Sequence, residues 1–213
     1  LASFNAVEQL QATAPDVIAI GPGLGFSEIA RDWLMAVLRY PTVPVAIDAD
    51  ALSLIADTPE YLDLLKQRNQ TFPGKTVITP HPGEAAHLLN TAADTIQANR
   101  LSALSQLIAL TNSIVVLKGQ HTLIASPAHS AVQCAQGNPG MAVGGMGDVL
   151  TGSIAAIAAQ GIRHNLNLWE ASCVGVQLHA SAADSLVEKQ IGPIGLTPTE
   201  VILEMRSLLN KLL

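Results

Sequence analysis

Aromatic and charged residues are scarce in this sequence. Phe, Trp and Tyr make up 3% of the 213 residues, and Asp, Glu, Lys and Arg together make up 13%. Single strands are bound by stacking bases on aromatic rings and duplexes by basic faces, so this composition and a net charge of −6 argue against nucleic acid as a partner. The 49% hydrophobic content supports a sizeable core and excludes a disordered chain.

Long apolar runs and cysteines are also few. The strongest apolar segments, such as residues 113–117 and 154–159, are far shorter than the roughly 20 residues that cross a bilayer, so we expect no membrane contact. Cys134 and Cys173 are too few for a disulfide framework or a four-thiolate metal site, although one disulfide stays open. We expect a cytoplasmic protein. The chain begins at Leu1 without an initiator Met or a secretory signal, which suggests a trimmed or partial chain.

Short runs rich in β-branched residues alternate with longer helical patterns. Because these runs lack the polar alternation of half-exposed strands, we expect helices on both faces of a mainly parallel sheet. The last two runs follow each other closely and predict an antiparallel edge. The predicted strands are residues 16–20, 43–47, 76–79, 113–118, 122–125 and 131–134. Without a repeat, linker or charge run, residues 1–213 are expected to form a single α/β domain.

Two helices near the C-terminus carry clear signals. Thr197 and Glu200 form a capping box around Pro198, and apolar residues with helical spacing follow it. A longer helix is predicted from about Trp169 to Lys189, where small residues recur with the same period. Such residues permit close packing against a neighbouring helix.

Ligands of an open parallel sheet bind beyond the carboxyl ends of its strands, where this sequence is rich in glycine and polar residues. Residues 21–25 contain three glycines, which permit a close approach to a ligand or simply reverse the chain, and Ser27 is expected to cap a helix. Asp48 and Asp50 follow the second strand. Paired carboxylates there could bind Mg²⁺, but Asp50 is better explained as the N-cap of a helix beginning at Ala51, whereas Asp48 stays open.

His81 follows the third predicted strand between Pro80 and Pro82. The two prolines restrict its backbone, so we expect His81 to contact a ligand. After the fourth strand, Lys118 and Gly119 offer a charge and N–H groups to a phosphate or nucleotide, or form a hairpin turn with a solvated lysine. A structural role better explains four other histidines, namely His87 in the following helix, His129 and His164 in loops, and His179 beside the apolar stripe of its helix.

The strongest segment is residues 137–152, GNPGMAVGGMGDVLTG. Its glycines lead into a helix, so unpaired N–H groups and the positive end of the helix dipole point at one spot, a natural anion site. A capping role for Asp148 would not need so many glycines before it. Because glycine costs stability, its repeated use here indicates that a ligand must come close to the backbone. We therefore predict Asp148 as a general base or a metal-linked acid. The predicted anion hole comprises Gly144, Gly145, Met146 and Gly147.

The glycine-rich segment matches neither a Walker A loop nor a dinucleotide fingerprint. A late glycine loop followed by an aspartate instead resembles the ribokinase-like superfamily, in which that aspartate deprotonates the hydroxyl that receives a phosphoryl group. Taken together, the motifs resemble the ADP- or ATP-dependent NAD(P)H-hydrate dehydratase family. They are PGLG at 22–25, DADAL at 48–52, TPHPGE at 79–84, KG at 118–119 and the segment at 137–152.

The resemblance implies a three-layer ribokinase-like fold and a lyase that repairs hydrated NADH and NADPH with ADP or ATP and Mg²⁺. Gly25, His81 and Asp148 would face the hydrated nicotinamide. Asp148 would take the proton from its C6 hydroxyl as that oxygen attacks the terminal phosphoryl group, and loss of phosphate would restore the double bond. The choice between ADP and ATP and the metal ligands stay open. The nucleotide would contact Lys118, Gly119, Gln120, His121, Thr122 and Gly147.

The resemblance also bears on chain length and partners. Family members have a further strand and glycine loop ahead of the region where Leu1 begins, so the resemblance implies a missing N-terminal strand and leaves open whether the chain is active alone. It further implies a homo-oligomer, often a tetramer, and in some members fusion to an epimerase domain. Two alternatives remain, a ribokinase-like kinase of a vitamin precursor or sugar and a nucleotide-binding module without catalysis.

Overall fold

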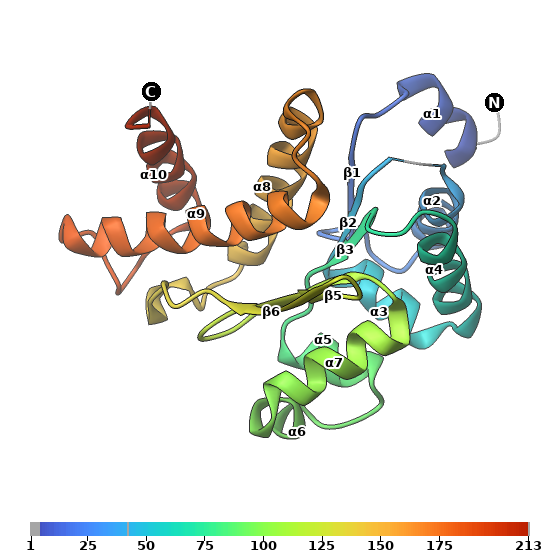
Figure 1. The fold of residues 1–213 in the computed structure, drawn as a ribbon, viewed down its shortest axis with the longest axis horizontal. Coiled ribbons are helices and arrows are strands. Elements are labelled where there is room, and N and C mark those ends of the chain that lie inside the picture. Colours follow the sequence, from blue (N-terminus) through green and yellow to red (C-terminus); the bar gives the residue numbers. More distant parts are fainter. Residues whose placement is uncertain (1–4, 42, 213) are drawn as a thin grey trace.

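The computed structural model describes residues 5–41 and 43–212, which contain a six-stranded sheet with helices on both faces (Figure 1). The order of the strands in the sheet follows the chain. Strands β1 to β4 run parallel, whereas β5 pairs antiparallel with both β4 and β6. The mainly parallel sheet and its antiparallel edge are therefore confirmed. The strands are β1 (Ile18–Ile20), β2 (Val45–Ile47), β3 (Thr76–Ile78), β4 (Ile114–Leu117), β5 (Leu123–Ser126) and β6 (His129–Gln133).

Two groups of helices cover the sheet. One face carries α1 (Ala6–Thr13), α2 (Glu28–Arg39), α3 (Ala49–Asp57), α4 (Pro59–Thr71), α5 (Pro82–Leu88), α6 (Ala93–Ala98) and α7 (Arg100–Thr111). The opposite face carries α8 (Met146–Gly161) and α9 (Leu168–Glu188), and α10 (Pro198–Asn210) packs against this pair. Two short 3-10 turns, η1 (Pro139–Met141) and η2 (Ile162–His164), lie at the ends of α8. This arrangement is the expected three-layer α/β fold.

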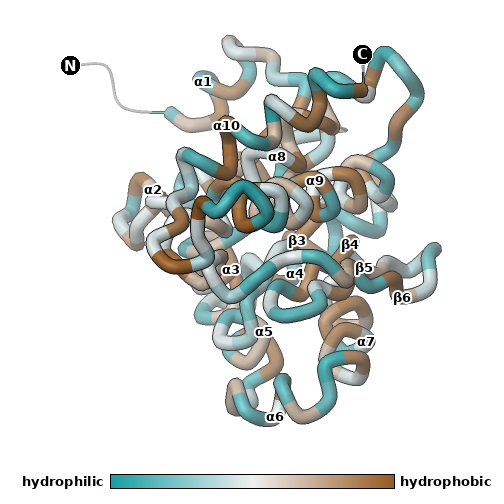
Figure 2. Tube along the Cα trace, turned by 90° about the vertical axis from the view of Figure 1, so that its left-hand side faces the viewer, coloured by the Kyte–Doolittle hydropathy of each residue, from teal (hydrophilic) through white to brown (hydrophobic). Residues whose placement is uncertain are grey.

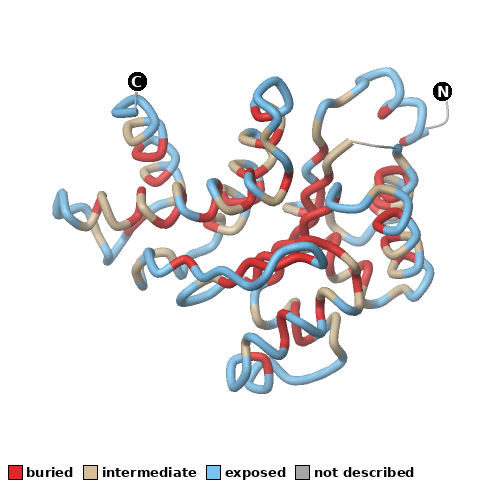
Figure 3. Tube along the Cα trace, viewed as in Figure 1, coloured by how far each residue is buried: buried red, intermediate tan, exposed pale blue. Residues whose placement is uncertain are grey.

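The strands divide their side chains between the two helical layers. In β4, Val115 and Leu117 pack with the α1–α7 layer, whereas Ile114 and Val116 pack with α8 and α9. Successive side chains of a strand point to opposite faces, so a strand covered on both sides is apolar throughout. Figure 3 shows buried residues concentrated along the sheet, and the hydrophobic segments in Figure 2 follow the same core.

Strand β6 departs from the prediction that both faces of every strand are covered. All five of its residues are exposed, and none belongs to a core cluster, because β6 is the last strand of the sheet.

His129 and His164, predicted in loops, lie in β6 and η2. The His129 ring stacks on Trp169 with a centroid separation of 4.4 Å, which agrees with a structural role.

Most helix signals are confirmed. Ser27 caps α2, and the predicted capping box of Thr197 and Glu200 begins α10. Helix α9 extends from Leu168 to Glu188, close to the predicted range. Its small residues pack tightly as expected, since a Cβ added at Gly175 would lie 2.8 Å from Ile154 Cγ1 of α8.

Two expectations drawn from the composition, on membrane-spanning segments and on the cysteines, can be compared with the structure. Among the described residues, no helix is both long enough and apolar enough to cross a membrane. Cys134 and Cys173 are free thiols, so the disulfide that the sequence left open is not formed. Burial is the main cause that raises the pKa of the Cys173 thiol.

A buried carboxylate connects the last two helices. Glu204 of α10 is 6% exposed and accepts hydrogen bonds from Ser185 Oγ at 2.8 Å and from Lys189 Nζ, both at the end of α9. The hydrogen bond from Lys189 is the main cause that lowers the pKa of Glu204. Ionised Glu204 therefore stabilises the packing of α10 on α9.

We predict that Glu204→Gln lowers the free energy of unfolding by about 2 kcal/mol at neutral pH, because a charged hydrogen bond is lost. A lowered folded-state pKa stabilises the protein above the ordinary carboxyl pKa, and this stabilisation disappears as the pH falls through the lowered value. Urea denaturation from pH 7 to pH 3 should thus show the two proteins converging in acid. A difference that stays constant with pH would contradict the assignment, and Glu188→Gln, an exposed control in α9, should change little.

Candidate active site

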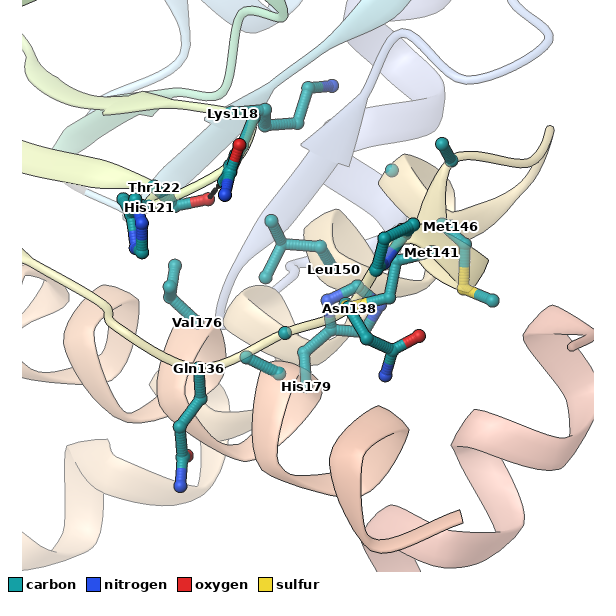
Figure 4. A pocket seen from close by; sticks show the side chains of 17 residues that line it. Lys118, His121, Thr122, Gln136, Asn138, Met141, Met146, Leu150, Val176 and His179 are labelled. Carbon is teal, nitrogen blue, oxygen red and sulfur yellow. Dashed lines mark hydrogen bonds between the residues drawn. The ribbon is translucent and has the colours of Figure 1, made fainter. Parts of the chain in front are cut away.

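A pocket of about 420 Å³ opens beyond the carboxyl end of β4 (Figure 4). All of residues 118–122 line it, together with Met146 and Gly147, so the structure brings the predicted nucleotide segment next to the predicted anion hole. These parts meet because the loop after β4 and the start of α8 share one edge of the sheet. Residues 137–139, 141–142 and Leu150 of the predicted glycine-rich segment complete the walls, together with four residues that the sequence analysis did not assign to a site, namely Gln136, Val176, His179 and Ala180.

The first turn of α8 offers two free backbone donors. Gly145 occupies the N-cap position with φ +88°, and the helix continues through sixteen residues. The N–H of Met146 donates to Val143 O at 3.4 Å, but among the described residues the N–H groups of Gly147 and Asp148 have no acceptor. Unpaired donors at the positive end of a helix form an anion site. The buried Met146 side chain belongs to the core, and the anion hole as a whole stays a prediction.

Lys118 is held by a buried carboxylate rather than solvated in a hairpin turn. Its Nζ lies 2.6 Å from Asp48 Oδ1 and 3.7 Å from Glu84 Oε2. The other oxygen of Asp48 accepts a hydrogen bond from Thr151 Oγ1 at 2.7 Å, and Asp48 is only 1% exposed. Asp48 therefore ties the carboxyl ends of β2 and β4 to helix α8.

The Lys118 ammonium lies against the first turn of α8. A Cβ added at Gly147 would stand 3.1 Å from Lys118 Nζ and 3.7 Å from Asp48 Oδ2. Glycine at position 147 thus lets the positive side chain approach the helix start, whose free N–H groups carry partial positive charge. Together they place an ammonium and two backbone donors side by side, while Asp48 and Glu84 offset the charge of the ammonium.

The backbone after β4 is braced by Arg100 of α7. Its guanidinium donates to Leu117 O at 3.0 Å and to Lys118 O at 3.3 Å. Gly119 has φ +137°, and a Cβ at this position would overlap the guanidinium. Burial lowers the pKa of Arg100, but the ordinary pKa of arginine is so high that the side chain keeps its charge at neutral pH. Arg100 therefore fixes the start of the loop that leads to Thr122.

The predicted capping role of Asp50 is wrong. Helix α3 begins at Ala49 rather than Ala51, and Asp50 lies within its first turn. Asp50 Oδ2 instead accepts a hydrogen bond from the N–H of Gly25 at 2.8 Å. The residue is free to do so because Asp48 takes the N-cap position, so Asp50 fixes the glycine loop after β1 against the end of β2.

His81 is an N-cap with an exposed ring. Its Nδ1 accepts from the N–H groups of Gly83 at 2.9 Å and Glu84 at 3.3 Å, and Glu84 accepts from the His81 N–H at 2.7 Å. In the neutral ring, Nε2 then carries the proton, and it lies 3.4 Å from Glu84 Oε1. The prolines thus serve a capping box, whereas a ligand contact of His81 stays a prediction.

The predicted substrate-binding residues do not line the pocket. Gly25 is linked to Asp50, while His81 reaches Lys118 through Glu84, and Asp148 is exposed on the first turn of α8. Lys118 therefore connects the pocket with Glu84, the carboxylate of the His81 capping box. The pocket residues and the predicted substrate-binding residues thus form two separate groups, as two different ligands would require.

Among the described residues, no group of three or more His, Cys, Asp and Glu side chains is arranged so that it could hold a metal ion. Both oxygens of Asp48 are already used by Lys118 and Thr151. Mg²⁺ often binds through substrate phosphates, waters and one or two carboxylates. These residues therefore fit an ion that arrives with a polyphosphate better than one held by the protein alone.

The fold defines a class of protein, a ribokinase-like α/β protein with a pocket at the start of a late helix. The sequence model of the NAD(P)H-hydrate dehydratase family matches residues 3–206, and the chain belongs to this family.

Relatives and solved structures agree with this assignment. The chain is 39% identical over 198 residues to the bifunctional NAD(P)H-hydrate repair enzyme of Coxiella burnetii, covering 93% of this chain and 37% of that protein. It is 37% identical over 194 residues to the ADP-dependent (S)-NAD(P)H-hydrate dehydratase of Neisseria meningitidis, covering 91% and 62%. The ADP/ATP-dependent NAD(P)H-hydrate dehydratase of Bacillus subtilis, co-crystallised with ATP and Mg²⁺, superimposes with a TM-score of 0.76 at 27% identity, covering 92% and 64%. The chain thus spans less than two thirds of each relative.

We predict that Gly147→Ala weakens ATP binding roughly fivefold, about 1 kcal/mol, because the new methyl group displaces Lys118 from the helix start. Gly152→Ala is the matched control, since it lies in the same helix with no atom within 4 Å of a new Cβ. It should leave ATP affinity unchanged and stabilise the helix by up to about 1 kcal/mol. Calorimetric titration measures both affinities, and equal affinities for the two variants would refute the placement of Lys118.

Proposed function

We propose that this chain dehydrates hydrated NADH and NADPH back to NADH and NADPH with ADP or ATP as the phosphoryl donor. Family membership supports the reaction, and the observation that carries it is the meeting of Lys118 with the free N–H groups of Gly147 and Asp148 beside a pocket. Charge stabilisation and positioning are the main requirements of phosphoryl transfer. This site offers both.

The nucleotide is assigned to the pocket and its terminal phosphate to the start of α8. Residues 118–122 and Gly147 line the pocket, and Lys118 has the positive charge that a phosphate requires. Mg²⁺ would arrive with the phosphate oxygens and offset their charge, as in other phosphoryl-transfer sites. Asp148, the exposed carboxylate at this helix start, is the available protein ligand or base.

Asp148 is assigned as the general base. Its carboxylate takes the proton of the C6 hydroxyl while that oxygen bonds to the terminal phosphorus, and the bond from this phosphorus to the nucleotide's bridging oxygen breaks. The products of this step are a phosphoester and AMP or ADP. Loss of phosphate from C6 and of a proton from the neighbouring carbon then restores the ring double bond. Gly25 and His81 are assigned to the hydrated nicotinamide.

The wider assignments concern assembly, location and a partner domain. A homo-oligomer, such as a tetramer, is supported by apolar residues on the outer face of α10, where Ile202 is 50% and Leu203 is 49% exposed. A cytoplasmic location is supported by the two free thiols. Cooperation with an epimerase domain is supported by relatives whose names describe bifunctional repair enzymes.

The reaction is tested by incubating the chain with hydrated NADH, Mg²⁺ and either ADP or ATP. We expect nucleotide-dependent recovery of dihydronicotinamide absorbance together with release of inorganic phosphate, and the two nucleotides give the donor preference. A stable phosphoester without phosphate release would indicate a kinase. Tight nucleotide binding without either product would indicate a binding module, and both results would contradict the proposal.

We predict that Asp148→Asn lowers turnover by a factor of about 100 or more while ATP affinity changes less than about twofold, because the amide cannot accept the proton. Asp94→Asn, in the exposed first turn of α6, is the matched control and should keep full turnover. Steady-state rates and calorimetric titration provide the comparison. Retained turnover in Asp148→Asn would remove Asp148 from the role of base.

A further inference from the structure

His179 of α9 lines the pocket and has no hydrogen-bond partner. The residue is 6% exposed and lines the pocket together with Val176 and Ala180 of the same helix. Its Nε2 is shut off from solvent, and among residues 5–41 and 43–212 no group forms a hydrogen bond with the ring. The sequence-based explanation of His179 as a structural residue therefore lacks the contacts that a structural histidine makes.

An unpartnered ring at this position is costly. A buried polar atom without a hydrogen bond costs about 1–3 kcal/mol, and folded proteins contain few such atoms. The neighbours of His179 in α9 are small and apolar, so leucine would suit this part of the wall better. Burial lowers the pKa of His179 to about 4, so the ring is neutral at pH 7 and has one donor and one acceptor.

The pocket differs in character from one end to the other. Lys118 and the free N–H groups at the start of α8 form an end rich in hydrogen-bond donors, whereas Met141, Leu150 and Val176 provide an apolar wall toward His179. Figure 4 shows Lys118 and His179 on opposite sides of the pocket. A nucleotide whose phosphates contact Lys118 therefore extends its base toward His179. A purine has apolar faces for such a wall and a polar edge that needs hydrogen bonds.

We propose that His179 is a specificity-determining residue, whose imidazole forms a hydrogen bond with the edge of the purine base of the bound nucleotide. This inference rests on the proposed function, because it takes the nucleotide as the occupant of the pocket. It explains why an imidazole stands where the core alone would favour an aliphatic side chain. Because Nε2 is shut off from solvent, the ring must shift slightly for the base to reach it, and the new hydrogen bond then offsets the cost of burial.

The test compares His179→Leu with His179→Gln, which restores one donor and one acceptor on a side chain of similar reach. For His179→Leu we expect Kd and KM for ATP to rise about tenfold, with kcat within about twofold of wild type. Binding of inorganic tripolyphosphate, which has no base, should be unchanged, and the Tm should not fall. His179→Gln should recover part of the affinity, and His87→Leu, outside the pocket, should bind ATP normally.

The outcomes separate this inference from the proposed function. If wild type binds and uses ATP but His179→Leu binds ATP equally well, the inference is overturned and the proposed function stands. Parallel loss of tripolyphosphate binding or a lower Tm would assign His179 a structural role and also overturn it. A rise in KM for hydrated NADH instead of ATP would contradict the assigned ligand. If wild type binds no nucleotide, both proposals fail.

Discussion

The ion pair between buried Asp48 and partly buried Lys118 is the interaction on which the site depends. The Asp48 carboxylate alone would be expensive in this environment, because removing the partner of a fully buried charge typically costs about 3–5 kcal/mol. Asp48 satisfies its second oxygen with Thr151, so the carboxylate has a partner on both sides. Since Asp48 directly follows β2, Lys118 directly follows β4 and Thr151 lies in α8, the parallel register of the sheet fixes where the Lys118 charge lies.

The placement of this charge bears on how an acidic protein would attract the anionic ligands that we propose. Lys118 points toward the start of α8, and glycine at position 147 leaves room for the ammonium beside two free N–H groups. At physiological ionic strength, salt screens the attraction exerted by a helix terminus and a nearby cation beyond about one Debye length. The local arrangement therefore matters for binding, whereas the net charge of −6 concerns solubility more than recognition.

Much of this arrangement could be predicted from the sequence, because strand periodicity and glycine-rich helix starts are local signals. Residues 118–122 and Gly147 meet as predicted, since carboxyl ends of parallel strands share one edge of the sheet. The contacts of Asp48 with Lys118 and of Asp50 with Gly25 were not predictable, because they join residues 70 and 25 positions apart. His179 shows the same limit, since its periodicity describes an apolar stripe and only the packed structure reveals its unpartnered ring.

The most direct measurement of the central claim is a crystal structure of this chain with Mg²⁺ and a non-hydrolysable ATP analogue. The account predicts that Lys118 stays on Asp48 while an oxygen of the terminal phosphate lies within hydrogen-bond distance of Lys118 Nζ and of the N–H groups of Gly147 and Asp148. A terminal phosphate bound elsewhere, with those N–H groups still unpartnered, would contradict it.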